Sequence, residues 1–438
     1  MLWYQVRIAL KSLRRNPVLS ALMICAVALG VGVSTTFVTG YYIFSLNPVP
    51  QKSGVLHYVE MDNWDPNRPW SDDDPKQVPN QITYRDMVEI MKSDIPTYKA
   101  GSFKASLFVH PDPKVGRPFK VEARMCFADF FNMFEPPFQY GGPWSPSADK
   151  GPDPVVVLSD ETNQKVFGGQ NSVGRMVKIE DREFKITGVL KPWSPRPKYY
   201  DTHNGAFENT EDVYMPFEHF RPLKIRSDGN TSNWKNFKWD DWDQFLASEA
   251  VWIQMWVQLD TLEQRDAYMS FLNSYVESQK KLGRMLRPTN NKLLPVMKWL
   301  EEDEVVPEEA TTLMVISLLF LLVCSLNLIG ILLGKFLARA PEVSVRRALG
   351  ANRKAIFLQH LIECETVAVI GGILGILVAF GGLRAVNSLF TAENFRFELD
   401  LNMLGVAILL SLISGLVAGA YPAWRICAIP PAIYLRER

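Results

Sequence analysis

The sequence is poor in the residues and motifs that mark catalytic or metal sites. Among 438 residues there are five cysteines and five histidines. The spacing of the histidines matches no metal-ligand pattern, and there is no Gly-x-Ser-x-Gly elbow and no Cys-x-x-Cys pair. We therefore predict no catalytic residue and no metal site, which argues against an enzyme.

Net charge is also absent, and charged side chains are missing from long parts of the chain. Lys and Arg number 47, as do Asp and Glu, a balance that would suit a soluble enzyme. Yet residues 17–51, 310–334, 366–383 and 401–424 contain no charged side chain. A membrane-spanning helix needs about 20 apolar residues, and these runs lack the polar stripe of a buried soluble helix. We predict four transmembrane helices, at residues 17–45, 309–335, 360–386 and 401–424.

Two of these runs need a further argument. The third reaches spanning length only when Leu361 and Ile362 are included, which brings Glu363 and Glu365 to its edge. The first could be a signal peptide, because basic residues precede it. Its apolar stretch is far longer than the roughly 7 to 15 residues of a signal core, so an uncleaved anchor is the better interpretation.

The basic residues beside the spans predict the orientation of the chain. They gather in residues 1–16, 336–359 and 425–438. By the positive-inside rule these segments, and with them the N and C termini, are expected in the cytoplasm. Residues 46–308 and the short loop 387–400 then lie outside. Residues 1–16 have an apolar and a basic side, as a helix in the membrane interface would, although an ordinary basic flank explains them equally well.

Residues 46–308 are expected to form a large two-lobed α+β domain outside the membrane. Three segments look like strands by their β-branched and apolar residues: Val155–Leu158, Met176–Ile179 and Phe184–Leu190. We expect the segment from about residue 100 to residue 210 to form one lobe, inserted into a second lobe that the rest of the domain forms. Only Cys126 lies in this domain, so no disulfide can form within it.

The end of this domain shows a second strand signal and a helix start. Val251–Leu259 alternates apolar residues as a half-buried strand would. Thr261 and Gln264 match a capping box, and Leu272 and Val276 share a face of the helix that would follow. These signals predict a strand and a helix directly after one another.

A cluster of tryptophans is the most unusual feature of the outer domain. Trp234, Trp239 and Trp242 lie close together, with lysines and aspartates between them. They could present a surface for a partner protein or a ligand. Packing in the core is the simpler explanation, because aromatic residues make up much of any core.

Pairs of glycines four residues apart occur in three of the predicted spans. Such pairs let helix backbones approach closely, within one bundle or between subunits. The pairs are Gly330 and Gly334, Gly371 and Gly375, and Gly415 and Gly419.

The loop between the second and third spans contains a short charged helix and no ATP site. Residues 330–335 mimic part of a Walker motif, but the spacing is short by one residue and Phe336 stands where Ser or Thr is needed. Pro341 suits the first turn of a helix, Glu342 suits its N-terminus, and Gly350 suits its end. A short helix held between two spans could act as a lever for a motor protein. A positive-inside loop without a partner is the alternative.

Several motifs together resemble one known family. The loop Pro341–Arg353, with its Glu, basic pair and Ala-Leu-Gly-Ala, and the segment Tyr421–Arg425 followed by Pro430–Ile433 resemble segments of the MacB-like permeases. This family also includes the lipoprotein-releasing permeases and the cell-division protein FtsX. The outer segments Val155–Leu158 and Ile186–Leu190 are similar to the domain that lies between the first two spans of these permeases.

The resemblance implies a function for the loop helix. It implies that this chain is a non-catalytic permease of an ABC transporter, without a cofactor of its own, and that a cytoplasmic MacB-type ATPase dimer binds ATP and Mg. Only 16 residues precede the first span, so we expect the ATPase to be a separate protein. The residues implied to dock on it are Glu342, Val343, Val345, Arg346, Arg347, Leu349 and Gly350.

The resemblance also implies partners, a location and an activity. We expect a second permease, identical or paralogous, and the family admits a periplasmic adaptor and an outer-membrane duct; no nucleic acid is expected. The chain would lie in the lipid bilayer of the bacterial cytoplasmic (inner) membrane and would pass ATP-driven motion to its outer domain, to export a peptide, lipid-linked or drug-like substrate. The alternative is an FtsX-like transmitter that regulates a cell-wall hydrolase.

Overall fold

The chain folds into two compact units, described here one at a time. The computed structural model describes residues 2–112, 114, 116–151, 153–229, 231–236, 241–389, 397–428 and 430. The helical unit comprises Met1–Ser45 and Val306–Arg438, and the sheet unit comprises Leu46–Val305. Of the predicted segments, part of the loop 387–400 and most of the tail 425–438 lie outside the described residues, as does Trp239.

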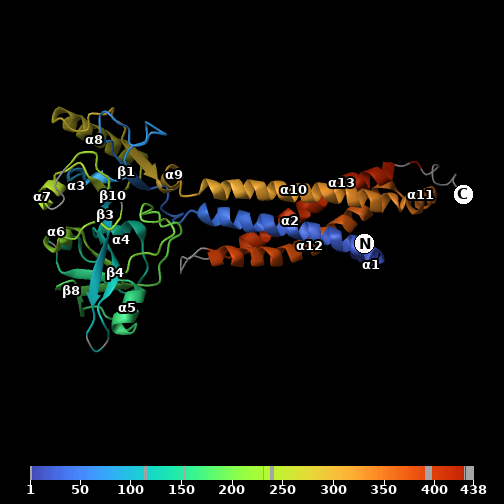
Figure 1. The fold of residues 1–438 in the computed structure, drawn as a ribbon, viewed down its shortest axis with the longest axis horizontal. Helices are drawn as coiled ribbons and strands as arrows, with labels where there is room; N and C mark the ends of the chain where they lie inside the picture. The colour runs from blue at the N-terminus through green and yellow to red at the C-terminus, as the bar shows by residue number, and fades with distance from the viewer. Residues whose placement is uncertain are drawn as a thin grey trace. The chain divides into compact units, whose positions relative to one another are not determined.

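The helical unit is built from four long apolar helices (Figure 1). These are α2 (Pro17–Phe44), α10 (Glu308–Leu337), α12 (Arg353–Leu389) and α13 (Leu401–Ala428). Each is long and apolar enough to span a membrane. Among the described residues of this unit, two short helices accompany them, α1 (Leu2–Arg15) and α11 (Ala340–Ala348). The helix α12 begins seven residues before the predicted span 360–386, because the segment from Arg353, which mixes basic and apolar residues, continues the same helix.

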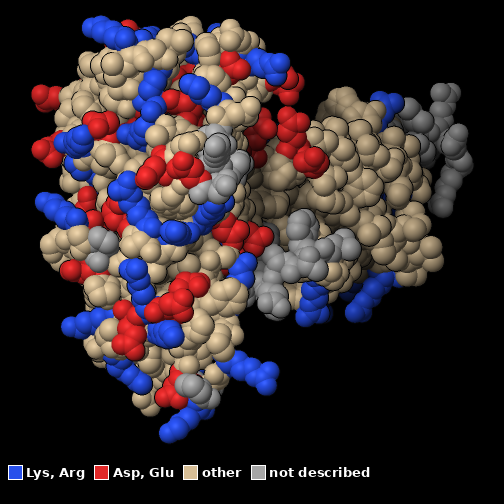
Figure 2. Space-filling model, turned by 60° about the vertical axis from the view of Figure 1, so that its left-hand side comes forward, with Lys and Arg blue, Asp and Glu red and all other residues tan. Residues whose placement is uncertain are grey.

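Small and hydroxyl residues hold the long helices together. Ser34 donates a hydrogen bond to the carbonyl oxygen of Ser317 at 2.6 Å, which joins α2 to α10. Ser411 donates one to the carbonyl oxygen of Ala368 at 2.6 Å, which joins α13 to α12. Such bonds and close backbone packing drive helix association in lipid, where water contributes little. Between its ends the helical unit exposes a largely uncharged surface (Figure 2).

The sheet unit contains one mixed sheet of eleven strands in its described part. The order of the main strands is β11-β1-β10-β3-β4-β9-β6-β8-β5, while β2 pairs with β10 and β7 with β3 and β8. The strands are β1 (Leu56–Glu60), β2 (Ile82–Thr83), β3 (Tyr98–His110), β4 (Phe119–Cys126), β5 (Phe138–Gly141), β6 (Val155–Leu158), β7 (Met176–Ile179), β8 (Arg182–Leu190), β9 (Val213–Pro216), β10 (Val251–Gln258) and β11 (Lys292–Pro295). The strands of residues 98–216 therefore lie next to one another at one end of a sheet that continues into the rest of the unit.

Seven α-helices lie around this sheet in the described residues. They are α3 (Tyr84–Ile90), α4 (Asp129–Phe134), α5 (Asp160–Phe167), α6 (Phe220–Leu223), α7 (Trp242–Leu246), α8 (Leu262–Lys281) and α9 (Val296–Glu302). The predicted capping box at the start of α8 is confirmed, because Thr261 accepts from the N–H of Gln264 while the side chain of Gln264 accepts from the N–H of Thr261. The three predicted strands Val155–Leu158, Met176–Ile179 and Phe184–Leu190 are also confirmed as β6, β7 and most of β8.

The sheet has a hydrophobic core on each of its two faces. Alternate residues of a strand point to opposite faces, so Val156 belongs to one core and Val157 to the other. This arrangement corrects the expectation for Val251–Leu259. The strand β10 is buried at every position, not half-buried, because it lies inside the sheet between β1 and β3 and both its faces are covered.

Candidate coupling site

The short helix α11 has the start and the end that its sequence predicts. Pro341 lies in the first turn, where its missing N–H costs nothing. Gly350 follows the helix with φ of +98°, a left-handed conformation that glycine adopts without strain. The N–H groups of Gly350 and Ala351 donate to the carbonyl oxygens of Arg347 and Arg346 at 3.1 and 3.0 Å, which closes the last turn as a Schellman motif.

One side of α11 packs against the long helices. Ala340, Val343 and Ser344 are buried, and Val343 belongs to the same hydrophobic cluster as Ile426 of α13. The guanidinium of Arg347 donates a hydrogen bond to the carbonyl oxygen of Cys427 at 3.1 Å. Val343 and Arg347 therefore fix α11 on the bundle, and they are not on the side that faces away from it.

The other side of α11 is exposed in the part of the chain that the structure describes. Leu349 is 83% exposed and Val345 is 47% exposed. Between them, Arg346 donates to Glu342 one turn earlier at 2.7 Å, and both side chains are about half exposed. Because positions 342, 345, 346 and 349 lie on one face of a helix, an apolar pair and an ion pair form a single exposed surface, which we call the α11 face.

A buried ionic cluster beneath α11 was not predicted from the sequence. Glu363 of α12 is buried, and its carboxylate lies 2.7 Å from the ammonium of Lys335 and 3.4 Å from the guanidinium of Arg339. Ser12 of α1 donates to the same carboxylate and accepts from Arg339. In the sequence, the cluster is indicated only by the opposite charges of Lys335 at the end of the second span and Glu363 at the start of the third. The cluster ties α1, α10 and α12 together directly before the chain enters α11.

The three glycine pairs differ in what surrounds them. A Cβ added at Gly371 would lie 2.7 Å from Val27 of α2, and one added at Gly375 would lie 3.1 Å from the carbonyl oxygen of Ala28. Gly415 and Gly419 face α12 in the same way, with Ala368 and Cys364 each 2.6 Å away. By contrast, apart from the adjoining backbone of α10 itself, no described atom lies within 4 Å of a Cβ added at Gly330 or Gly334. A packing role for this last pair stays a prediction.

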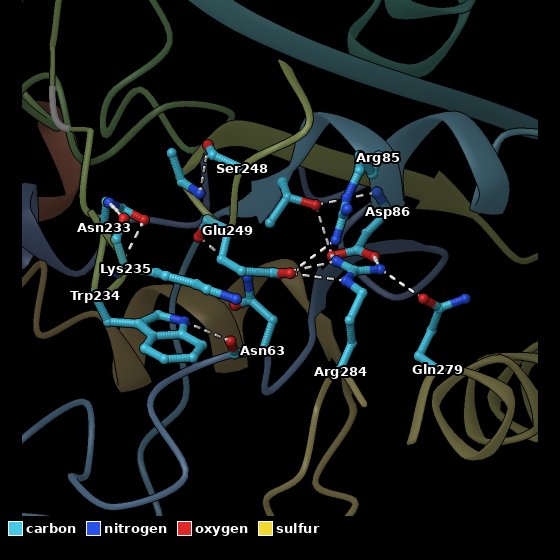
Figure 3. A network of polar contacts seen from close by, with 12 residues as sticks. Asn63, Arg85, Asp86, Asn233, Trp234, Lys235, Ser248, Glu249, Gln279 and Arg284 are labelled. Carbon is cyan, nitrogen blue, oxygen red and sulfur yellow. Dashed lines mark hydrogen bonds and ion pairs between the residues drawn. The ribbon is translucent and has the colours of Figure 1, made fainter. Parts of the chain in front are cut away.

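Two of the three clustered tryptophans, Trp234 and Trp242, make contacts within the sheet unit. The indole N–H of Trp234 donates to the carbonyl oxygen of Asn63 at 3.0 Å (Figure 3). Trp242 packs against the core, with its ring 5.6 Å from that of Phe245 and 5.9 Å from that of Phe220. For these two residues the contacts favour packing within the domain over a shared partner surface.

The polar network beside Trp234 also joins parts of the domain to one another. Arg284 and Arg85 point at the carboxylate of Glu249 in Figure 3, and their nitrogens lie 2.7 to 2.9 Å from its oxygens. Arg284 also pairs with Asp86 at 3.1 Å. Burial alone would lower the pKa of Arg284, but these two carboxylates hold it well above its usual range. The network joins α3, the end of α8 and the start of β10.

The sheet unit has a polar cavity of about 940 Å³. Its walls include Trp299 and several carboxylates, among them Glu60, Glu302 and Asp303. The ammonium of Lys292 pairs with two of these carboxylates, at 3.3 Å from Glu60 and 2.6 Å from Glu302. Burial raises the pKa of Glu60 to about 7, only partly opposed by Lys292. Such a lining suits a polar ligand better than an apolar one.

The raised pKa of Glu60 predicts a stability that falls with pH. The folded chain holds a proton on Glu60 that the unfolded chain releases above about pH 4.5, so the contribution of Glu60 to stability is lost as pH rises toward about 7 and stays constant above it. We expect Glu60→Gln to flatten this dependence and to raise the unfolding free energy at pH 8 by about 1 to 2 kcal/mol. Thermal unfolding of the full chain in detergent between pH 5 and 8 checks this. A wild-type chain that is equally stable at pH 5 and pH 8 would contradict it.

Comparison with known proteins identifies both parts of the chain. Residues 20–272 match the family model of the MacB-like periplasmic core domain, and residues 314–431 match that of the FtsX-like permease C-terminal region. The macrolide export ATP-binding/permease protein MacB of Syntrophobacter fumaroxidans is 24% identical over 335 residues, which cover 70% of this chain and 46% of that protein. The MacB of Salmonella typhimurium is 23% identical over 374 residues, which cover 84% of this chain and 50% of that protein. The chain spans about half the length of the curated relatives it matches.

Two solved structures also align with the chain. The extracellular domain of the noncanonic ABC-type transporter YknZ from Gram-positive bacteria aligns with 55% of this chain and 99% of its own, at 12% identity and a TM-score of 0.34. The periplasmic region of MacB from Actinobacillus actinomycetemcomitans aligns with 59% of this chain and 97% of its own, at 12% identity and a TM-score of 0.36.

Proposed function

This chain belongs to the MacB-like, FtsX-type permeases, and from that premise we propose that it passes ATP-driven motion from a separate ATPase to its outer domain, which exports a substrate. The motion would enter through the α11 face. The sheet unit would be the outer domain, and both termini and α11 would lie in the cytoplasm.

The observation that carries this proposal is the two-sided character of α11. Its inner side is fixed to the bundle by Val343 and Arg347, while Leu349 and Val345 stay exposed beside the ion pair of Glu342 and Arg346. An exposed apolar pair flanked by charges is typical of a binding surface. Because α11 is joined to α10 and α12 by short turns, a force on it acts on two long helices at once.

Membership of the family supports a proposal for the partners and the substrate. We propose a MacB-type ATPase dimer that binds ATP and Mg, and a second copy or paralogue of the permease. An adaptor and an outer-membrane duct would complete export across two membranes. MacB relatives are named as macrolide exporters, and for this chain we propose a peptide, lipid-linked or drug-like substrate.

A substitution on the α11 face tests the proposal. We expect Leu349→Glu to weaken binding of the ATPase about tenfold or more, because a carboxylate then replaces an exposed apolar anchor. The full chain is purified from its host together with the ABC ATPase that accompanies it, and ATP hydrolysis and the amount of bound ATPase are measured. Leu349→Met is the matched control and should leave both unchanged.

The ion pair offers a second test on the same face. Glu342→Arg and Arg346→Glu each break the pair. The double exchange restores an ion pair along the helix, and its reversed orientation costs at most a few tenths of a kcal/mol. A partner that reads the positions of the two charges still loses affinity in the double variant. Full ATPase binding and hydrolysis in Leu349→Glu, or full recovery in the double variant, would contradict docking through this face.

A further inference from the structure

A groove of about 710 Å³ runs along the helical unit where α1 meets α2 and where α10 leads into α11. Its walls include Arg15, Lys335 and Arg339 at one end and Leu19, Gly330 and Gly334 at the other. The groove thus has a basic part and an apolar part. It lies entirely within the helical unit and shares only Glu342 with the α11 face.

The basic part has more positive charge than its own carboxylates neutralise. Lys335 and Arg339 share one carboxylate, that of Glu363, at 2.7 and 3.4 Å. Glu342 also borders the groove, but it is paired with Arg346 at 2.7 Å. Arg15 has no acidic partner among the described residues, and its side chain is exposed. A partly buried excess of positive charge is costly unless an anion joins it.

The apolar part has room for a chain of methylene groups. No described atom lies within 4 Å of a Cβ added at Gly330 or at Gly334, so the surface of α10 is hollow there. Leu19 of α2 borders the same hollow. In the other two glycine pairs a neighbouring helix fills this space. The hollow over Gly330 and Gly334 is therefore open to whatever lies beside α10 in the membrane.

We propose that this groove binds an anionic phospholipid. Its phosphate would lie between Arg15 and Arg339, whose guanidinium groups match phosphate oxygens with paired N–H donors, and one acyl chain would lie over Gly330 and Gly334. The head and the tail of a phospholipid match the two parts of the groove in order, and basic pockets between membrane helices are known to bind anionic headgroups. A soluble phosphate compound would leave the apolar part empty.

Lipid retention by purified variants tests this proposal. The full chain in detergent is mixed with phosphatidylglycerol or with phosphatidylcholine of the same acyl chains, and bound lipid is counted by native mass spectrometry. We expect the wild type to prefer phosphatidylglycerol about tenfold, roughly what one or two charge-assisted contacts supply. Arg15→Gln should remove this preference. Gly330→Leu, which fills the hollow, should reduce retention of both lipids.

Matched controls make the outcome decisive. Arg7 is exposed on α1 and does not border the groove, so Arg7→Gln should behave like the wild type. Equal loss of phosphatidylglycerol in Arg7→Gln and Arg15→Gln, or equal retention of the two lipids by the wild type, would overturn the assignment. So would a second copy in the groove, seen as an oxidised dimer of Gly330→Cys in membranes when Cys25 and Cys324 are replaced by serine.

Discussion

Replacing Arg124 with methionine is expected to destabilise the sheet unit by about 3 to 5 kcal/mol, the usual cost of removing one partner from a buried ionic network. Arg124 lies on β4, and its side chain is fully buried, as are those of Asp201 and Glu211, to which its guanidinium donates hydrogen bonds. Without Arg124, two buried carboxylates would share the ammonium of Lys198, which lies 3.6 Å from Glu211. Methionine fills a similar volume, so lost charge and not a cavity dominates the change.

The neighbours of these carboxylates cannot replace the guanidinium. Tyr200 donates to Glu211 at 2.9 Å, and Gln254 donates to Asp201 at 3.1 Å. Both are neutral donors, so they offset only part of the cost of burying a charge. The network also joins strands β4 and β10 to residues 198–211, which makes its loss a loss for the whole unit.

The effect of Arg124→Met should depend on pH, and its sign follows from Asp201. Burial alone would raise the pKa of Asp201, but Arg124 and Lys198 outweigh it and hold the pKa at about 2. A lowered pKa contributes stability that is present above about pH 4 and is lost only as pH falls toward about 2. Without Arg124 we expect burial to outweigh Lys198 and to raise the pKa of Asp201 above its unfolded value, so the variant should lose stability as pH rises. The gap between wild type and variant should therefore be larger at pH 7 than at pH 5.

Thermal unfolding of the full chain in detergent, followed by tryptophan fluorescence, measures this gap. Arg124→Met combined with Asp201→Asn leaves Glu211 with Lys198, and we expect it to recover part of the lost stability. Lys165→Met breaks an exposed pair with Glu161 and should change stability by at most about 0.5 kcal/mol. If Arg124→Met is as stable as Lys165→Met, the buried network does not hold the unit together.

The features that could be predicted from the sequence are those with local causes. The spans follow from runs without charge, and the strand Val155–Leu158 follows from consecutive β-branched residues. The ends of α11 follow from Pro341 and Gly350, and the start of α8 from a capping box. Each of these signals lies within about four residues of the structure it specifies, as helix caps and turns do.

The features that could not be predicted depend on residues far apart in the chain. The strand β10 was expected to be half-buried because Gln254 and Gln258 alternate with apolar residues. In the fold, Gln254 is buried and donates a hydrogen bond to Asp201, 53 residues away. A polar residue at this position therefore does not indicate a face of the strand that is exposed to solvent. The parallel pairing of β4 with β9 likewise joins residues some 90 positions apart.

The short helix that carries the candidate coupling residues was predicted in its position, but which of its sides is buried was not. All seven named residues lie on α11 or at its C-terminal end, and nothing in their order along the chain separates buried from exposed positions. Packing against α13 turns Val343 inward and leaves Leu349 exposed. The ionic cluster of Glu363 was missed because its members come from three helices. Which side of a short helix faces a partner is decided by tertiary contacts, which one sequence does not show.

Replacing Gly371 with valine should separate α2 from α12 and destabilise the helical unit by about 3 kcal/mol, toward the upper end of the range for overpacking a tight contact. The new Cβ would lie 2.7 Å from the Cβ of Val27 and 3.1 Å from the carbonyl oxygen of Ile24. Neither neighbour can move without its helix backbone. The contact is reciprocal, because a Cβ at Gly32 of α2 would lie 2.6 Å from Val378 of α12. Neither helix therefore has room for an added side-chain atom at these contacts.

The chain provides its own control for this substitution. Gly334→Val makes the same chemical change in another span, where no described atom lies within 4 Å of the added Cβ. Both variants gain the same few tenths of a kcal/mol in helix propensity, so the difference between their melting temperatures in detergent isolates the clash. Gly371→Ala, which adds only the Cβ, should fall between the wild type and Gly371→Val. Equal melting temperatures for Gly371→Val and Gly334→Val would mean that α2 and α12 do not pack closely in the membrane.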